Sequence, residues 1–473
     1  MFGRILLVKG MLLALFLTGL FRVEAHATTY TLTVTVNGTG SGTVTSSPAG
    51  ISCKPTCTAS IAAGTVVKLT AAAASGSYLT AWSGACKGTS NTCTVTMNSN
   101  VAVAATFNVN QTVKVLNHII FMAQENRGLD HYWGALREYW RANKFSDISF
   151  DGLPQFNPTS GTAPLYGPPP SNPGCDPNYP PPNDCTEDSN SPKVTSYNLV
   201  TQCIENPSPS WNESHVDWNL SNPVSSTPML NGYVYTNAHD ARNEGYYDTN
   251  GIRAMGYYDG NALNYYYYMA SQFSTSDRWF SPVMSRTQPN RHYLIAATSQ
   301  GYAYPIGTNS KDSSLLTAQT IFQKLEAAGI SWKIYVNPKN TPCASNPTAQ
   351  CLLSYTYIQD FQWGHTIPTS YASHLVPISK YFTDVQNGTL PQVAMIESAG
   401  PAGLDEHGSD SDQYPIDIQL GAQYVESLIN ALMKSTSWKD SAFILTYDEA
   451  GGLYDHVAPH TAVSPDGIKP VDL

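Results

Sequence analysis

The sequence predicts an α/β fold with a mainly parallel sheet and helices on both of its faces, preceded by a small all-β domain. Residues 28–109 alternate polar and apolar side chains with a period of two between Gly and Asn turns, which is typical of short half-buried strands. From residue 113 onward, apolar runs of strand length alternate with helical patterns, as in parallel sheets. The 473 residues exceed one ordinary domain, so we expect two, at 28–109 and 113–473.

The first domain is expected to bind a surface or act as a spacer, and to carry no chemistry. Its clearest strands are Thr31–Val36 and Thr92–Met97, and it holds few titratable groups. The segment Ala81-Trp82-Ser83-Gly84 gives it a resemblance to the small β-rich repeats found on bacterial surface and secreted proteins.

The second domain is predicted from segments with distinct hydrophobic patterns. Val115–Ala123 is a nearly continuous apolar run, which is typical of a strand buried on both faces. The later elements are expected to be a helix at Leu315–Ala328 closed by Gly329, a strand at Trp332–Val336, a helix at Ile416–Met433 and a buried strand at Ala442–Tyr447. Residues 152–193 are rich in Pro, Asn and Ser and are expected to form a long irregular insertion.

The first 27 residues have the pattern of a secretion signal. Arg4 and Lys9 precede the apolar run Met11–Phe21, and Ala25-His26-Ala27 gives a small-x-small cleavage pattern. An uncleaved membrane anchor is the alternative. No other stretch approaches the roughly 18 apolar residues of a membrane span. We therefore expect a secreted or periplasmic protein of a bacterial cell envelope, without a transmembrane span after cleavage.

Export makes disulfides the expected state of most of the nine cysteines. Short-loop pairs are expected for Cys53/Cys57, Cys86/Cys93 and Cys343/Cys351, whereas Cys175, Cys185 and Cys203 leave one cysteine unpaired, and the sequence does not say which. Two Cys-x-x-Cys units with the spacing of a zinc site do not occur, so a structural zinc is not expected.

The net charge of −10, without a cluster of Lys and Arg, argues against a nucleic-acid partner. An acidic chain repels a phosphate backbone at long range. A small phosphate ester can still bind where a metal ion or local positive charge offsets that field.

Acidic and amide side chains follow two of the predicted strands. Glu125 and Asn126 follow the first, and Asp448 and Glu449 follow the last. Ligands of open α/β sheets bind beyond the carboxyl ends of the strands, where these distant groups can meet. Their oxygens suit a divalent metal ion, whose identity the sequence does not fix. The alternative is that each acid caps a following helix or turn.

A threonine stands where a helix is expected to begin. Pro289, in Thr287-Gln288-Pro289-Asn290-Arg291, suits the first turn of a helix, so Thr287 would lie just ahead of the helix N-terminus. The free N–H groups and the dipole of such a terminus favour a phosphoryl anion. A hydroxyl beside a metal ion can lose its proton and attack phosphorus. A simple capping role for Thr287 is the alternative.

Three motifs resemble those of a bacterial phosphoesterase family that contains phospholipases C and acid phosphatases and is related to alkaline phosphatases. Glu125–Gly134 resembles the family sequence Glu-Asn-Arg-Ser-Phe-Asp-His-Tyr-Phe-Gly, and Thr287–Arg291 resembles Thr-x-Pro-Asn-Arg. Thr446–His456 resembles Thr-Tyr-Asp-Glu-Gly-Gly-Gly-x-x-Asp-His. The resemblance covers about residues 113–473 and implies an alkaline phosphatase-like fold.

The resemblance implies a role for individual residues. Metal ligation falls to Glu125, Asn126, Asp448 and Glu449, the nucleophile to Thr287, substrate binding to Asn290 and Arg291, and proton donation or phosphate binding to His215 and His407. We interpret two further histidines inside the motifs, His131 and His456, as structural hydrogen-bonding groups.

The chain departs from the family pattern in several places. Gly128-Leu129 replaces Ser-Phe, Ala450 replaces Gly, and Pro209 stands where many relatives carry a histidine, which weakens the proton-donor role of His215. The chain stops at Leu473, whereas relatives continue, so we expect it to be truncated at the C-terminus.

The expected function is that of a secreted metal-dependent phosphoesterase with a threonine nucleophile. The aromatic run Tyr265–Tyr268 could contact lipid, which favours a phospholipid substrate and a phospholipase C-like activity, although its packing into the core is the alternative. An acid phosphatase acting on soluble monoesters is the next hypothesis. A non-catalytic surface-binding protein is the hypothesis from another class, and a sulfatase or phosphomutase accounts less well for the motifs.

Overall fold

The structure is a computed structural model that describes nine stretches of the chain. These are residues 28–54, 56–74, 76–109, 116–146, 149–158, 166–188, 190–307, 314–407 and 417–470. The expected signal segment, residues 1–27, lies outside them. The chain divides into two compact units, Met1–Val115 and Leu116–Leu473, which are described separately below.

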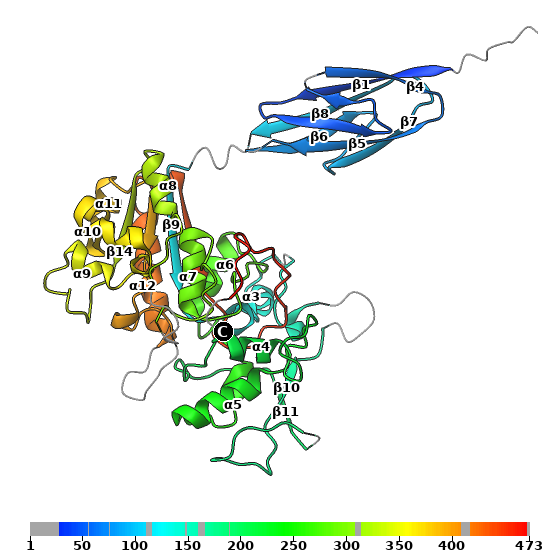
Figure 1. The fold of residues 1–473 in the computed structure, drawn as a ribbon. Coiled ribbons are helices and arrows are strands. Elements are labelled where there is room, and N and C mark those ends of the chain that lie inside the picture. The colour runs from blue at the N-terminus through cyan, green and yellow to red at the C-terminus, as the bar shows by residue number, and fades with distance from the viewer. Residues whose placement is uncertain are drawn as a thin grey trace, which may run out of the picture. The chain divides into compact units, whose positions relative to one another are not determined.

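The N-terminal unit consists of two four-stranded sheets, which confirms the predicted all-β domain (Figure 1). One sheet has the order β4-β1-β8-β6 and the other β3-β2-β5-β7. The strands are β1 Thr29–Asn37, β2 Gly42–Ser47, β3 Ser52–Cys53, β4 Thr56–Ala62, β5 Val66–Ala73, β6 Ser77–Gly84, β7 Thr92–Thr96 and β8 Val101–Val109. Alternate side chains of both sheets, such as Leu32 and Leu69, are fully buried between them.

The second unit is built on a five-stranded parallel sheet of the order β15-β14-β16-β9-β17. Its strands are β9 His118–Gln124, β14 Trp332–Val336, β15 Leu375–Pro377, β16 Val393–Ile396 and β17 Ser441–Tyr447. The predicted strand at residues 332–336 is therefore correct to the residue. The strand predicted at residues 115–123 begins at His118.

Helices cover both faces of this sheet, as predicted (Figure 1). Ile120 and Ile396 pack on one face with α3, α6, α11 and α12, whereas Ile334 and Met395 pack on the other with α7, α8 and α9. The helices are α2 Leu129–Trp133, α3 Leu136–Ala142, α4 Trp211–Trp218, α5 Tyr233–Glu244, α6 Asn264–Gln272, α7 Thr287–Ala296, α8 Ile321–Ala327, α9 Ala349–Leu353, α10 Ile367–Ser370, α11 Ser379–Asn387 and α12 Ile418–Met433. Neighbouring side chains of a strand point to opposite faces, which explains the two clusters.

Two predicted helices begin later than expected. Helix α8 begins at Ile321 instead of Leu315, because Thr320 and Gln323 form a capping box that starts the helix there. Leu316 instead forms a bridge with Phe361. Helix α12 is capped by Asp417, and the predicted start at Ile416 lies outside the described residues.

The prediction that residues 442–447 form a buried strand is wrong, because none of the seven side chains of β17 is buried. Within the described residues β17 pairs with β9 alone, and Ile444 is 38% exposed. A groove of about 690 Å³ runs along all seven residues of β17. An apolar run in the sequence therefore does not show how deeply a strand is buried in the sheet.

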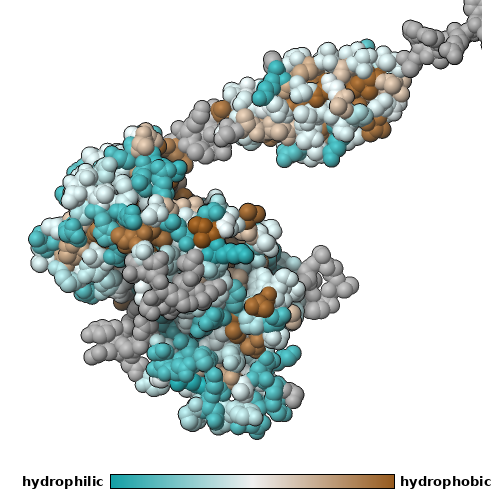
Figure 2. Space-filling view, viewed as in Figure 1, coloured by the Kyte–Doolittle hydropathy of each residue, from teal (hydrophilic) through white to brown (hydrophobic). Residues whose placement is uncertain are grey.

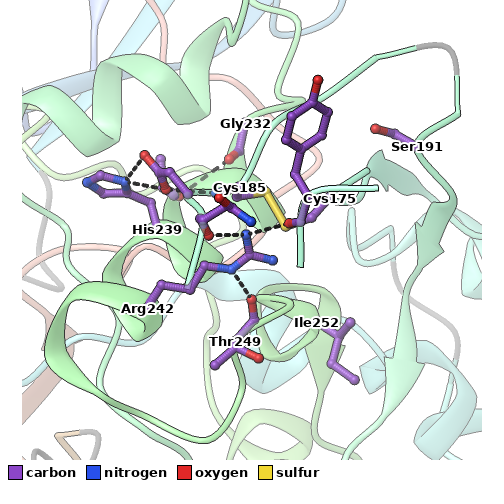
Figure 3. The surroundings of a disulfide bond; sticks show 12 residues. Cys175, Cys185, Ser191, Gly232, His239, Arg242, Thr249 and Ile252 are labelled. Carbon is purple, nitrogen blue, oxygen red and sulfur yellow. Dashed lines mark hydrogen bonds and ion pairs between the residues drawn. A yellow bond between two sulfur atoms is a disulfide. The ribbon is translucent and has the colours of Figure 1, made fainter. Parts of the chain in front are cut away.

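The proline-rich insertion is largely irregular, as predicted, and a disulfide closes its central loop. Cys175 and Cys185 form this bond, and the guanidinium of Arg242 on α5 donates to the carbonyl oxygens of Asn183 and Thr249 beside it (Figure 3). Short strands β10 Ser171–Pro173 and β11 Lys193–Thr195 pair on either side of the loop. The three expected disulfides also form, and Cys203 is the unpaired cysteine.

The tyrosine run of α6 packs mainly into the core. Tyr266 and Tyr267 are buried, whereas Tyr268 is 51% exposed. Packing was the alternative to lipid contact, and the structure favours it. Within the described residues, no helix has the length and apolar character to span a bilayer. Hydrophobic side chains on the face seen in Figure 2 form small, separate patches.

His456 links the chain after β17 to helix α2. Its Nδ1 lies 2.8 Å from Asp130 Oδ2, and its Nε2 lies 3.1 Å from Asp151 Oδ1. Burial alone would lower the pKa of His456, but its bonds to Asp130 and the charge of Asp455 raise it to about 9. Asp130, Asp455 and His456 are also spaced closely enough for a metal ion, but both ring nitrogens already bond carboxylates. A protonated His456 therefore accounts for this cluster, in agreement with its predicted structural role.

We expect Leu428→Ala in α12 to lower the free energy of unfolding of the second unit by about 2–5 kcal/mol, because Leu428 is fully buried and its loss leaves a cavity. Leu420→Ala on the same helix is the control, since Leu420 is 47% exposed and should cost less than about 1 kcal/mol. Urea unfolding followed by tryptophan fluorescence measures both. Equal losses in the two variants would contradict the assignment of the buried face.

We expect His456→Gln to destabilise the second unit by about 2 kcal/mol at pH 6. The pKa of His456 is raised in the folded state, so its stabilising effect is complete below pH 6.5 and is lost as the pH rises through about 9. The difference in melting temperature between wild type and variant should therefore shrink between pH 6 and pH 10. His365→Gln, at an exposed position, serves as the control. A difference that stays constant over this range would refute the charged link.

Candidate active site

The two acidic clusters meet at the carboxyl ends of β9 and β17. Tyr447 pairs with Gln124, so the residues that follow these two strands are direct neighbours. The backbone N–H of Asn126 donates to Asp448 Oδ1 at 3.2 Å. Glu125, Asn126, Asp448 and Glu449 are each at most 3% exposed. The adjacency of β9 and β17 thus brings together side chains more than 300 residues apart in sequence.

The turns after both strands need unusual backbone conformations. Asn126 has a φ of 57°, in the left-handed region that Asn tolerates better than most residues. Gly451 has a φ of 70°, and a Cβ atom there would lie 2.2 Å from the carbonyl oxygen of Asn126. A glycine at position 451 is therefore required for the two turns to pack together.

Helix α7 carries Thr287 to these side chains. Arg286 is the N-cap and Thr287 is the first helical residue, so α7 begins one residue earlier than predicted, and Pro289 lies in the first turn as expected. Thr287 Oγ1 lies 3.1 Å from Glu125 Oε2 and 3.5 Å from Asn126 Oδ1. The hydroxyl group thus lies beside two of the predicted metal-binding oxygens and at the N-terminus of a helix.

Asn290 and Arg291 are fully buried and bond to protein atoms. Asn290 Nδ2 donates to the carbonyl of Ser285 at 2.9 Å, and Asn290 Oδ1 accepts from the N–H of Val283 at 3.1 Å. These bonds fix the turn that precedes Thr287. Direct substrate contact was expected for both residues, but their observed partners are the preceding loop and the acidic clusters.

Arg291 joins the ends of the two strands. Its Nη2 lies 2.7 Å from Glu125 Oε1, and its Nε lies 3.1 Å from Asp448 Oδ2. Burial alone would raise the pKa of Glu125, but the charges of Arg291 and His407 lower it to about 2. Burial and the charge of Glu125 raise the pKa of Asp448 to about 7, and burial together with Asp448 raises that of Glu449 well above its usual range. Arg291 thus bonds two of these three buried carboxylates directly.

His407 contacts the site through Asn126. Its Nε2 lies 2.8 Å from Asn126 Nδ2, and its Nδ1 lies 3.3 Å from Asp405 Oδ2 and 3.8 Å from Glu125 Oε2. Burial would lower the pKa of His407, but Asp405 and Glu125 raise it above its usual value.

His215 is not joined to this group by any hydrogen bond or ion pair within the described residues. It lies on α4, stacks on Trp211 with ring centroids 4.2 Å apart, and bonds the carbonyl of Trp211 through Nδ1 at 2.7 Å. Burial lowers its pKa. The structure therefore brings together the predicted site residues with the exception of His215.

The residues present fit a divalent metal ion. Glu125, Asn126, Asp448 and Glu449 offer the hard oxygen atoms that Mg²⁺, Ca²⁺ and Mn²⁺ prefer, and Zn²⁺ also accepts carboxylates. Glu449 Oε1 is buried without a hydrogen-bond partner, which is costly for a carboxylate unless a ligand completes its environment. Arg291 bonds Glu125 and Asp448 but carries one positive charge, so a bound cation would also compensate the remaining negative charge of the carboxylates.

Two residues of the site lie outside the recognised motifs, and the sequence analysis did not identify them. Tyr357 Oη and Ser398 Oγ donate to Glu125 Oε1 at 3.0 and 2.9 Å. Ser398 lies just beyond β16, so the strand-end rule that identified Glu125 could have found it. Tyr357 begins the short 3₁₀ helix η3, Tyr357–Asp360, for which no hydrophobic period or spacing gave a signal.

The N-terminal and C-terminal units match different families. Residues 116–470 match the Phosphoesterase family, and residues 32–111 match the Divergent InlB B-repeat domain.

The chain is also similar to three curated phospholipases C. It is 28% identical over 367 residues to Non-specific phospholipase C4 of Arabidopsis thaliana, with 74% of this chain and 57% of that protein covered. It is 25% identical over 374 residues to Non-hemolytic phospholipase C of Burkholderia pseudomallei, with 74% and 46% covered. It is 24% identical over 368 residues to Phospholipase C A of Mycobacterium tuberculosis, with 73% and 60% covered. The chain thus spans about half the length of these relatives. The family match covers most of the chain and includes every residue of the site, and the chain therefore belongs to the Phosphoesterase family.

Proposed function

We propose that the chain is a phosphoric ester hydrolase with phospholipase C-like activity, in which Thr287 attacks phosphorus. The observation that carries this proposal is the position of the Thr287 hydroxyl, 3.1 Å from Glu125 Oε2 and 3.5 Å from Asn126 Oδ1, at the start of α7. The names of the relatives, which are phospholipases C, agree with it.

The reaction would proceed in two displacements. In the first, the Thr287 hydroxyl gives its proton to solvent and its Oγ bonds to phosphorus while the bond from phosphorus to the alcohol oxygen breaks, and the alcohol leaves with a proton from His407. In the second, a water oxygen bonds to phosphorus, the bond to Thr287 Oγ breaks, and the phosphorylated product leaves. Thr287 and His407 regain their protons, so each cycle consumes one ester and one water.

Glu125 orients the Thr287 hydroxyl but is a weak base. With a pKa of about 2, its carboxylate has little tendency to take the hydroxyl proton at neutral pH. A divalent ion held by Glu125, Asn126, Asp448 and Glu449 would lower the pKa of the hydroxyl and offset the charge of the phosphoryl group. The free N–H groups at the start of α7 favour the same anionic group.

We assign the leaving-group proton to His407 instead of His215. His407 lies next to Glu125 and Asn126, and Asp405 and Glu125 raise its pKa, which favours the protonated ring that a general acid needs. His215, with its lowered pKa and its bond to Trp211, lacks both features.

We also propose that the protein is exported to the cell envelope or secreted. Four disulfides in one chain suit an oxidising compartment. The N-terminal β unit would then serve as a binding or spacer module. A role limited to surface binding is the competing proposal, and it requires the second unit to be inactive.

We expect Thr287→Ala to lower kcat at least about a thousandfold, since the nucleophile is lost. Thr287→Ser keeps a hydroxyl group and should retain activity within about a hundredfold of wild type. Neither change removes a helix cap, so both variants should unfold within about 1 kcal/mol of wild type. Steady-state kinetics with a soluble aryl phosphate ester measures the difference. Full activity of the alanine variant would exclude the covalent step.

We expect a chelator to abolish hydrolysis and added divalent salt to restore it. The substrate is tested with two assays on the same preparation: release of phosphocholine from phosphatidylcholine vesicles, and release of phosphate from the aryl ester. Phospholipase C-like activity requires the first to have the larger kcat/KM, whereas the reverse order indicates an acid phosphatase. If the chain binds a cation but cleaves neither substrate, the result would support the surface-binding alternative.

A further inference from the structure

One oxygen of Glu125 accepts hydrogen bonds from three donors, whereas the other accepts one from Thr287. Oε1 accepts from Arg291 Nη2 at 2.7 Å, from Ser398 Oγ at 2.9 Å and from Tyr357 Oη at 3.0 Å. Oε2 faces the Thr287 hydroxyl at 3.1 Å. A carboxylate oxygen has about two lone-pair sites, so three donors leave Oε1 no room for a further ligand.

Three separate segments supply these donors. Arg291 comes from α7, Ser398 follows β16, and Tyr357 begins η3. The η3 segment is held in place by Asp360, which lies 2.8 Å from His292 Nε2 and accepts the N–H of Leu316 through its carbonyl. The Tyr357 ring also lies over the guanidinium of Arg291, 4.9 Å from its centroid. Tyr357 thus contacts both members of the Arg291–Glu125 pair.

We propose that Tyr357 and Ser398 are positioning residues that close Glu125 Oε1, so that Glu125 binds the metal ion through Oε2 alone. The inference rests on the proposed function, because it assigns the geometry of the same site. A carboxylate without these donors could rotate or bind the ion through both oxygens, and the oxygen facing Thr287 would lose its fixed place. Groups that orient a ligand in this way typically change metal affinity 10–100-fold when removed.

The test measures cation binding by the full chain after treatment with a chelator. Mn²⁺, Ca²⁺ and Zn²⁺ are titrated separately by calorimetry into wild type, Tyr357→Phe, Ser398→Ala and the double variant. Phenylalanine keeps the ring over Arg291 and removes only the hydroxyl. Tyr355→Phe is the matched control, since Tyr355 lies two residues earlier and packs against the same apolar cluster.

We expect each single variant to bind the ion a few-fold more weakly, because two donors still hold Oε1. In the double variant Arg291 is the only one of the three donors left on Oε1. Its affinity for the ion should therefore fall about 10–100-fold, which is more than the product of the losses in the two single variants. Excess cation should restore kcat in the double variant, which a general packing defect would not allow. The control should bind as wild type does.

Two results would overturn the inference. One is a double variant that binds the ion as tightly as wild type, and the other is an equal loss in Tyr355→Phe. A wild-type chain that binds no divalent ion would refute both this inference and the cation dependence of the proposed function. A wild-type chain that binds the ion but cleaves no phosphate ester would refute the proposed hydrolysis alone, since the affinities still test Tyr357 and Ser398.

Discussion

The buried guanidinium of Arg291 is the group on which the arrangement of the site depends. It bonds Glu125 after β9 and Asp448 after β17, so one side chain of α7 ties two strand ends together. Without it, each buried carboxylate would cost several kcal/mol in lost hydration. Arg291 follows Thr287 by four residues and therefore lies on the same side of the helix. The contact that compensates the acids thus also fixes the helix that presents the hydroxyl group to them.

Arg291 does not compensate all of the negative charge of the buried carboxylates, and this distinguishes the site from a structural ion pair. Arg291 bonds both Glu125 and Asp448, yet Asp448 and Glu449 keep raised pKa values and Glu449 Oε1 has no partner. A protein selected for stability alone gains little from burying Glu125, Asp448 and Glu449 side by side, because each buried carboxylate loses its hydration. Strongly perturbed acids together with a left-handed Asn126 indicate that the strand ends are arranged for a ligand.

Hydrophobic patterns in the sequence predicted the helices and strands, and the position of acidic residues at the carboxyl ends of two strands predicted where they meet. Neither kind of reasoning predicted which side chains of other segments contact them. The strand at residues 332–336 was predicted correctly because a short apolar run after a Gly-closed helix leaves little freedom. The predicted burial of β17 was wrong because an apolar run does not record how much of a strand is covered by other segments. The roles of Arg291 and Tyr357 could not be derived, since they depend on where α7 and η3 pack on the finished sheet. His215 was favoured by its motif alone, and the structure joins it to Trp211 instead.

The position of Thr287 explains why neither the cation nor the substrate would bind well alone. The N-terminus of α7 favours an anionic phosphoryl group, but Glu125, Asp448 and Glu449 oppose it through their charge. The same carboxylates favour a divalent ion, which the helix terminus and Arg291 oppose. A cation and a phosphoryl anion bound together satisfy both sets of groups, so each should strengthen the binding of the other. The hydroxyl of Thr287 lies at the boundary between these two regions, which is where the proposed mechanism places the reacting phosphorus.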